Sequence, residues 1–447
     1  MIEFVYIPII LLLYVRTFRF SCLIDDHVPR GGYLLNLTEK PDHYTYYDQR
    51  RSILATVTNI GVFMASCLGV HLNFGWQAAL LYAVFPLNVC GVAWTTGNYY
   101  QSTVLLILTC YYFVTHFGWV GDLLGAVFYV SALGSTVSAI PFALLLPFIS
   151  QEHWAVYGLY FATLLKYLFG YRFQTGLKMR AEKHANIHVK SWKTHPNRLI
   201  FATKLMAYYI ALSIAPMRLG FWHTGYKQEM KEGKAYKPTR VFWLSLICCV
   251  LFLCLGYQEN LVSALWWFAF MLLFGQIFHF GMTIAERYTL IANVGFCLMV
   301  AELLSAVPFL YTVLATLWFC RSWYYVKDFK NNRDLLLANI DNFPEAEEPM
   351  NNLGCHYKER GNYIKAVECF KMAIKYAVNE SYNNYSNLMD CLARSGQYGD
   401  ALLYGRLALR LCPEDKIPLT TSYIAQIEEK CRDIDRKKKL LKRQGII

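Results

Sequence analysis

The sequence predicts an all-α protein, in which a bundle of about eleven membrane helices is followed by a short helical repeat domain. Charged residues make up 17% of the chain, whereas about a quarter of a soluble domain is charged. Between positions 52 and 151, Asp122 is the only aspartate, glutamate, lysine or arginine, and a surface without charge is unsuited to water. After position 350, a pattern of small and aromatic residues recurs every 35 residues, which is typical of helical solenoids.

The membrane helices are predicted from apolar runs that approach the length of about 20 residues needed to cross a bilayer core. Polar breaks divide residues 1–323 into eleven such runs, at 2–20, 53–71, 76–94, 102–118, 122–150, 153–171, 199–215, 241–257, 261–280, 288–306 and 308–322. The run 122–150 counts as one pass, although Gly134-Ser135-Thr136 and Pro141 offer break points, because a broken helix is tolerated where it faces protein or a cavity. The first run lacks a basic n-region and a cleavage site, so it is interpreted as a membrane helix.

The basic residues predict the orientation of the chain in the membrane. Residues 172–198 carry seven lysines or arginines and one glutamate, and the positive-inside rule places such a loop in the cytoplasm. With one helix per run, residues 21–52, 216–240 and the chain after 323 then share the extracytoplasmic side. The formal net charge of +12 is attributed to loops that face anionic membrane lipids, and no nucleic-acid partner is expected. We therefore expect a multi-pass protein of the plasma or inner membrane or of the endoplasmic reticulum.

The repeat domain is predicted over residues 324–415. The 35-residue period combines small residues where two helices cross with aromatic residues beside them, which is the tetratricopeptide (TPR) pattern. Two full repeats and one partial repeat are expected, and residues 416–447 are expected to form a capping helix with a basic tail. The concave surface of such a solenoid suits a protein partner. The first copy contains Leu353, Tyr357, Gly361, Tyr363, Ala366 and Ala373, and the second contains Leu388, Leu392, Gly396, Tyr398, Ala401 and Ala408.

Asp25 and Asp26 are the first candidates for chemistry, because they lie directly after the first predicted membrane helix and are followed by His27. Adjacent carboxylates repel each other, which favours proton uptake by one of them, so either could act as a general base. The alternative is a solvated helix end without a catalytic role.

Glu286-Arg287-Tyr288 is the second candidate, at the start of the tenth apolar run. An arginine at the membrane interface can bind a lipid phosphate through two parallel hydrogen bonds. The alternative is an arginine that reaches to the interface and pairs with its neighbour Glu286. A third candidate is the segment 85–100, in which Trp94 and Asn98 either line a cavity or belong to a helix turn with interfacial aromatic residues.

Other ionisable residues fall inside or at the ends of predicted membrane helices, where such groups are functional candidates by default. Lys204 and Glu302 lie deepest, whereas Lys166 and Asp122 lie near the ends and are expected to reach the interface. No metal site is predicted, since the fourteen cysteines contain no C-x-x-C pair and no H-E-x-x-H motif occurs.

Taken in order, these pieces resemble the transmembrane and tetratricopeptide-repeat O-mannosyltransferases and their bacterial relatives, which are GT-C membrane glycosyltransferases. The resemblance depends on the acidic pair, on the Pro-x-x-Val-x-x-Val-Ala-Trp-x-x-Gly segment at 86–97, and on Glu-Arg-Tyr before a helix containing Val-Gly-Phe-Cys at 294–297. It continues through the juxtamembrane segment 328–337 into Asn-Asn-Leu-Gly at 351–354. The match in order and topology covers nearly the whole chain.

The resemblance implies an enzyme that moves a sugar from a polyprenyl-phosphate donor to Ser or Thr hydroxyls of a protein on the extracytoplasmic side. Asp25 or Asp26 would take the acceptor proton. Arg287 and Tyr288 would bind the donor phosphate, and the residues expected to line the cavity are His27, Trp94, Asn98 and Glu286. No cofactor is implied beyond the lipid-linked donor, and metal dependence stays open.

Three positions depart from the family pattern. Phe85 stands where relatives commonly have His, Asn98 where they have Arg, and Gly134-Ser-Thr-Val137 where they often have Ser-Lys-Glu. These changes remove polar or charged groups near the expected site. The alternative function is therefore a catalytically silent GT-C relative that acts as a membrane-anchored TPR scaffold for a protein partner.

Overall fold

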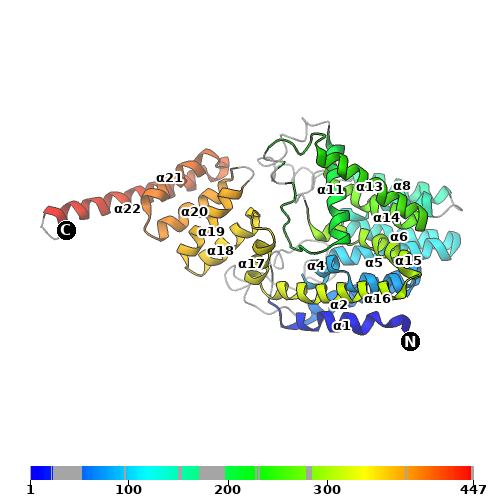
Figure 1. The fold of residues 1–447 in the computed structure, drawn as a ribbon. Coiled ribbons are helices and arrows are strands. Elements are labelled where there is room, and N and C mark those ends of the chain that lie inside the picture. Colours follow the sequence, from blue (N-terminus) through cyan, green and yellow to red (C-terminus); the bar gives the residue numbers. More distant parts are fainter. Residues whose placement is uncertain are drawn as a thin grey trace. The chain divides into compact units, whose positions relative to one another are not determined.

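A computed structural model describes residues 2–21, 23, 53–94, 97–149, 154–170, 197–226, 229, 232–277, 284–377 and 380–443. Every secondary-structure element in these residues is a helix, so the all-α prediction is confirmed for them. The chain divides into two compact units, Met1–Leu335 and Leu336–Ile447 (Figure 1). The division falls inside α17 (Asn332–Asn342), downstream of the predicted boundary at residue 323.

Helices form within each of the eleven apolar runs. In chain order the first unit contains η1 (Ile2–Phe4), α1 (Tyr6–Tyr14), η2 (Val15–Arg19), α2 (Ile53–Phe74), α3 (Trp76–Val84), η4 (Pro86–Asn88), α4 (Val89–Ala93), α5 (Asn98–His116), α6 (Gly118–Ser135), η6 (Val137–Ala139), α7 (Phe142–Ile149), α8 (Trp154–Leu168), α11 (Arg198–Ile214), α13 (Arg240–Glu259), α14 (Leu261–Leu272), the π-helix η8 (Leu273–Ile277), η9 (Glu286–Thr289), α15 (Ala292–Ser305), α16 (Pro308–Tyr325) and η10 (Val326–Lys330).

The run 122–150 is divided between two helices. α6 ends at Ser135, and the extended backbone of Thr136 leads into the short η6 before α7 begins. The Thr136 hydroxyl accepts a hydrogen bond from the Ser138 amide and contacts the Thr103 hydroxyl of α5 at 3.1 Å. The helix therefore breaks within the predicted segment 134–136. The Thr136 side chain stabilises the break, because it accepts a hydrogen bond from a backbone amide at the start of the next helical turn.

The run 76–94 is bent by 63° between α3 and the η4–α4 segment. Pro86 causes this bend, since it lacks an amide hydrogen and forces Phe85 into an extended conformation. Asn88 secures the bend: its amide nitrogen donates to the Tyr82 carbonyl at 2.7 Å, and its oxygen accepts from Asn293 of α15 at 2.8 Å. The bend directs the chain toward Trp94.

Within the described residues, α2 is the one helix whose length and apolar composition suffice to cross a membrane. The bent pair Trp76–Val84 and Pro86–Ala93 meets the same requirement when it is counted as a single span. The prediction of eleven membrane passes is finer than this finding, so it stays a prediction.

The second unit is built from paired helices: α18 (Glu347–Glu359) with α19 (Tyr363–Tyr376), and α20 (Tyr382–Arg394) with α21 (Tyr398–Arg410). Gly361 and Gly396, 35 positions apart, form equivalent turns and have φ of +74° and +82°, which favour glycine. The 3-10 turn η11 (Glu414–Lys416) precedes α22 (Ile417–Arg443), one long helix that ends the described chain (Figure 1).

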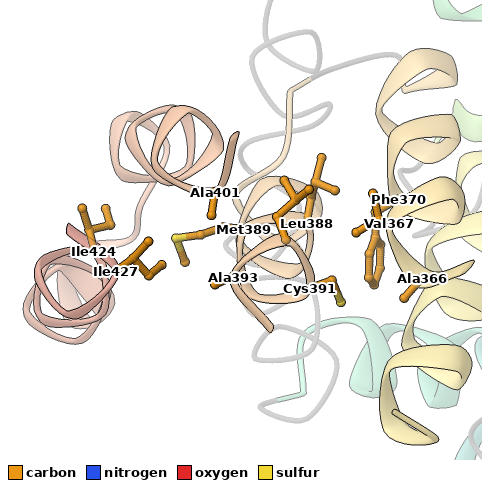
Figure 2. Packing of buried hydrophobic residues seen from close by; sticks show 11 residues of the cluster. Ala366, Val367, Phe370, Leu388, Met389, Cys391, Ala393, Ala401, Ile424 and Ile427 are labelled. Carbon is orange, nitrogen blue, oxygen red and sulfur yellow. The ribbon is translucent and has the colours of Figure 1, made fainter. Parts of the chain in front are cut away.

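The core of the second unit lies between successive helices. Figure 2 shows Phe370 and Val367 of α19 on one side of α20, and Ile424 and Ile427 of α22 on its other side. Small side chains let the helices approach closely, because a Cβ atom at Gly354 would lie 2.7 Å from the Phe370 ring. The alanines at equivalent positions of the two helix pairs are fully buried: Ala366, Ala373, Ala401 and Ala408.

Candidate functional site

The Glu286 carboxylate is the centre of a buried polar cluster in the first unit. It belongs to η9, a single turn of 3-10 helix, and the residue is 1% exposed. One oxygen accepts from the Gly220 amide at 2.7 Å and contacts His223 Nε2 at 3.1 Å, and the other accepts from the Tyr325 hydroxyl at 2.6 Å. A buried carboxylate is costly unless its oxygens are hydrogen-bonded, and here both oxygens are.

The partners of Glu286 come from distant parts of the sequence. Gly220 and His223 lie in the segment 215–226, which follows α11, and Tyr325 is the last residue of α16. The segment turns back onto α11, where His223 Nδ1 lies 3.1 Å from the Tyr208 hydroxyl. The segment 216–240 lies between two predicted apolar runs, yet its members Leu219, Phe221 and Trp222 are buried. The segment therefore packs as part of the bundle.

Lys204 binds residues further along the loop 216–240. Its side chain is fully buried on α11 and makes an ion pair with Glu229 at 2.7 Å, while Nζ also donates to the Lys234 carbonyl at 3.2 Å. The Tyr226 hydroxyl donates to the Lys204 carbonyl at 2.8 Å. This deep lysine, a functional candidate from its position, thus has a structural partner.

The Arg287 guanidinium lies among aromatic rings, next to the Glu286 cluster. Its central carbon is 4.9 Å from the centroid of the Phe221 ring, 5.3 Å from that of Tyr288 and 5.6 Å from that of Trp94. Such distances are typical of cation–π contacts. The Trp94 and Phe221 rings meet edge to face at 4.8 Å, and Tyr288 stacks on Phe274 at 4.3 Å. The rings form an apolar wall around a partly buried cation.

Hydrogen bonds to its carbonyl oxygen hold Trp94 beside this wall. The Trp94 carbonyl accepts from the Gly97 amide at 3.0 Å and from the Asn59 side chain of α2 at 3.2 Å. A Cβ atom at Gly97 would lie 2.9 Å from the Cys90 carbonyl oxygen, so the close approach requires glycine.

The structure brings together four of the predicted site residues, namely Trp94, Glu286, Arg287 and Tyr288. Glu286 binds Gly220, His223 and Tyr325, and the Arg287 guanidinium lies against aromatic rings. The alternative of a direct pair between Glu286 and Arg287 stays a prediction. Asn98 begins α5 and accepts a hydrogen bond from Ser102 at 3.4 Å. Asp25, Asp26 and His27 lie outside the described residues.

The positions that depart from the family pattern have apolar or local partners. Phe85 is fully buried, and its ring centroid lies 4.6 Å from that of Trp318 and 5.5 Å from that of Phe296.

The deep carboxylate of Glu302 accepts from Asn260 at 2.7 Å. No group of three or more histidine, cysteine, aspartate or glutamate side chains in the described ranges is arranged to hold a metal ion.

Sequence reasoning did not single out Gly220, His223 or Tyr325. The one available signal was the Gly-Phe-Trp-His sequence at 220–223, an aromatic cluster inside an otherwise polar loop.

Comparisons with models of protein families, with curated proteins and with solved structures found no match. The functional conclusion therefore depends on the residues themselves.

Proposed function

We propose that the protein is a polytopic membrane glycosyltransferase that moves a sugar from a polyprenyl-phosphate donor to Ser or Thr hydroxyls of a protein on the extracytoplasmic side. The observation that carries the proposal is the Arg287 guanidinium, enclosed by the rings of Trp94, Phe221 and Tyr288 beside a hydrogen-bonded Glu286. A planar cation in apolar surroundings suits a phosphate that carries a long hydrocarbon chain, because the electrostatic attraction is stronger where water is excluded.

The outward faces of the first unit support a membrane location with several passes. On α13, Trp243, Leu244 and Leu251 are 57%, 67% and 64% exposed. Large apolar side chains are also exposed along α2, α6 and α16, among them Ile53, Leu72, Val127, Val130, Phe309 and Leu317. Soluble monomers rarely expose such extended apolar surface, whereas lipid tails are its natural neighbours.

The second unit supports assignment as a TPR solenoid. Its two helix pairs have equivalent glycine turns and equivalent buried alanines, as the TPR pattern requires. We propose that α17 is the second helix of a partial first repeat, that α18–α21 form two full repeats and that α22 is the cap. Its proposed role is to hold the protein acceptor.

The proposed reaction needs one proton acceptor and one cation. The acceptor hydroxyl oxygen forms a bond to the anomeric carbon, the bond between that carbon and the phosphate oxygen breaks, and the proton passes to Asp25 or Asp26. Polyprenyl phosphate leaves with the bonding electron pair, and Arg287 stabilises the charge that develops on it. Replacing the essential aspartate by asparagine should lower turnover by about 10²–10⁴-fold.

The second candidate function is a catalytically silent scaffold that holds a protein partner through its TPR unit. The observation that favours it is Phe85, which packs against the rings of Trp318 and Phe296 where relatives commonly have a histidine. In this case the Arg287 site would bind membrane lipid phosphate without turnover.

The deciding experiment measures sugar transfer from a radiolabelled polyprenyl-phosphate sugar in membranes that contain the full-length chain. We expect product with the wild type and none above background with Arg287→Ala. Arg240→Ala is the matched control. Arg240 is an exposed arginine at the start of α13 and does not belong to the proposed binding site. Binding of the lipid phosphate without transfer, across donors with different sugars, would favour the scaffold.

A further inference from the structure

Four side chains of the first unit form a continuous hydrogen-bonded chain beside Arg287. The Tyr208 hydroxyl lies 3.1 Å from His223 Nδ1, His223 Nε2 lies 3.1 Å from Glu286, and the Tyr325 hydroxyl donates to Glu286 at 2.6 Å. The His223 and Glu286 side chains are fully buried. Since a carboxylate only accepts, Nε2 carries the hydrogen in its bond to Glu286, and in the neutral ring Nδ1 accepts from Tyr208.

The element that carries Arg287 depends on such external ties. η9 is only four residues long, and the Thr289 hydroxyl, which donates to the Glu286 carbonyl at 2.8 Å, is its local side-chain support. A single 3-10 turn has few internal bonds. Fixing the Glu286 carboxylate through three donors therefore also fixes the backbone of the next residue, Arg287.

The same histidine segment supplies part of the wall around the cation. Phe221, whose ring lies 4.9 Å from the Arg287 guanidinium, stands between Gly220 and His223, and both of these bind Glu286. Displacing His223 would move the carboxylate anchor and the Phe221 ring together.

We infer that His223 is a positioning residue, which holds Glu286 and the Phe221 ring so that the Arg287 guanidinium faces the phosphate of a lipid-linked ligand. The inference rests on the proposed function for the identity of the ligand, and on the hydrogen-bonded chain for the role of the histidine. His223, which lies in the loop 216–240, has no other role in the proposed reaction.

The test compares His223→Leu with His223→Gln in the full-length chain. Leucine removes the donor to Glu286, whereas the glutamine amide keeps one. His71→Leu is the matched control, because His71 Nδ1 on α2 also lies 3.1 Å from a tyrosine hydroxyl, that of Tyr6. With a fluorescent polyprenyl monophosphate as the probe, we expect His223→Leu to bind about 10–100-fold more weakly. We expect His223→Gln to stay within about threefold of the wild type, and His71→Leu to match the wild type.

A second measurement separates this inference from the proposed function. Phenylglyoxal modifies arginine side chains. Its rate of reaction with Arg287 in the absence of lipid, measured by mass spectrometry of the peptide that contains Arg287, reports how accessible the guanidinium is. We expect an altered rate in His223→Leu, restored in His223→Gln. Failure of the wild type to bind the probe would overturn the proposed function, and the modification rate would still decide the role of His223.

Equal probe binding and equal modification in His223→Leu and the wild type would overturn the inference. If His223→Leu does not fold, Tyr208→Phe takes its place, because it removes only the hydroxyl that contacts Nδ1. We expect a smaller change of the same sign in both measurements, and no change in either would again overturn the inference.

Discussion

At the scale of single residues, Glu286 and Arg287 are neighbours with separate tasks. The carboxylate is directed toward Gly220, His223 and Tyr325, which tie three segments of the first unit together. The guanidinium is directed toward aromatic rings. One residue therefore anchors the turn, and the next presents a charge.

The geometry of the guanidinium should matter as much as its charge. Arg287→Lys keeps the charge, but an ammonium group is a compact, strongly hydrated cation that cannot make two parallel hydrogen bonds to phosphate or lie flat against a ring. We expect probe affinity to fall about tenfold or more, corresponding to roughly 1.4 kcal/mol. Titration of the polyprenyl monophosphate against the purified variant measures this, and full affinity would reduce Arg287 to an interfacial charge.

In the second unit, Asp390 has the clearest dependence on pH. Burial alone would raise the pKa of its carboxyl, but hydrogen bonds from Lys358, Tyr423 and Arg394 hold the pKa below its usual range. A depressed folded-state pKa contributes stability above the unfolded value of about 3.9, and the contribution is lost as the pH falls through the folded value. The cluster joins α18, α20 and α22.

We therefore expect Asp390→Asn to lower the free energy of unfolding of this unit by about 1–3 kcal/mol at pH 6. The difference from the wild type should shrink as the pH falls below about 3.9 and then through the depressed folded pKa, because a protonated Asp390 is neutral, as asparagine is. Protection factors for exchange of the α20 amides measure the effect, since they correct for the intrinsic pH dependence of exchange. Asp400→Asn at an exposed position is the control, and a constant difference between Asp390→Asn and the wild type would contradict the prediction.

At the scale of elements, close approach between helices is set by small residues and by bends. Pro86 bends the α3–α4 region, and Gly97 permits a close approach to the Cys90 carbonyl oxygen. In the second unit, Gly354 lies against the Phe370 ring. These positions belong to the local pattern, so their structural effect can be predicted from the sequence.

Two glycine substitutions in the second unit should have opposite effects. Gly354→Ala places a Cβ atom 2.7 Å from the Phe370 ring, so we expect a loss of about 1–3 kcal/mol of stability. Gly399→Ala in α21 meets nothing within 4 Å, so we expect a gain of up to about 1 kcal/mol from helix propensity. Exchange protection of the α18–α21 amides in the full-length chain compares them, and equal values would argue against tight packing at Gly354.

The helices could be predicted far better than the site. Apolar runs and turn residues are local signals, and a helix forms in each predicted run. The packing of 215–226 against η9 was not predicted, because the Gly220–Glu286 bond joins residues 66 positions apart and leaves no local period. The polar composition of the loop concealed Leu219, Phe221 and Trp222, which tertiary contacts bury.

At the scale of the whole molecule, the sidedness of the proposed membrane protein decides how an acceptor could reach the site. Eleven passes would put the second unit and Asp25 on the extracytoplasmic face. A variant whose only cysteine is Cys412, which is partly exposed, should react with an impermeant thiol reagent in intact cells. A variant whose only cysteine replaces Lys183 in the basic loop should react only after the membrane is opened.

Two outcomes would change this model. Labelling of Cys412 only after selective opening of the plasma membrane would place the second unit in the cytoplasm, and the scaffold function would then be favoured over acceptor presentation. Labelling that requires further opening of internal membranes would place the unit inside an internal compartment, in agreement with the proposal.

The cluster around Glu286 also has a consequence for protein synthesis. The Asn88–Asn293 and Tyr82–Leu290 bonds join residues 205 and 208 positions apart, and Tyr325 completes the set near the end of the first unit. At translation rates of 5–20 residues per second, the bend at Asn88 waits roughly 10–40 s for its partner to be made. The site can therefore assemble only after the ribosome has passed Tyr325, and a nascent chain that stops earlier contains most of the helices but no completed site.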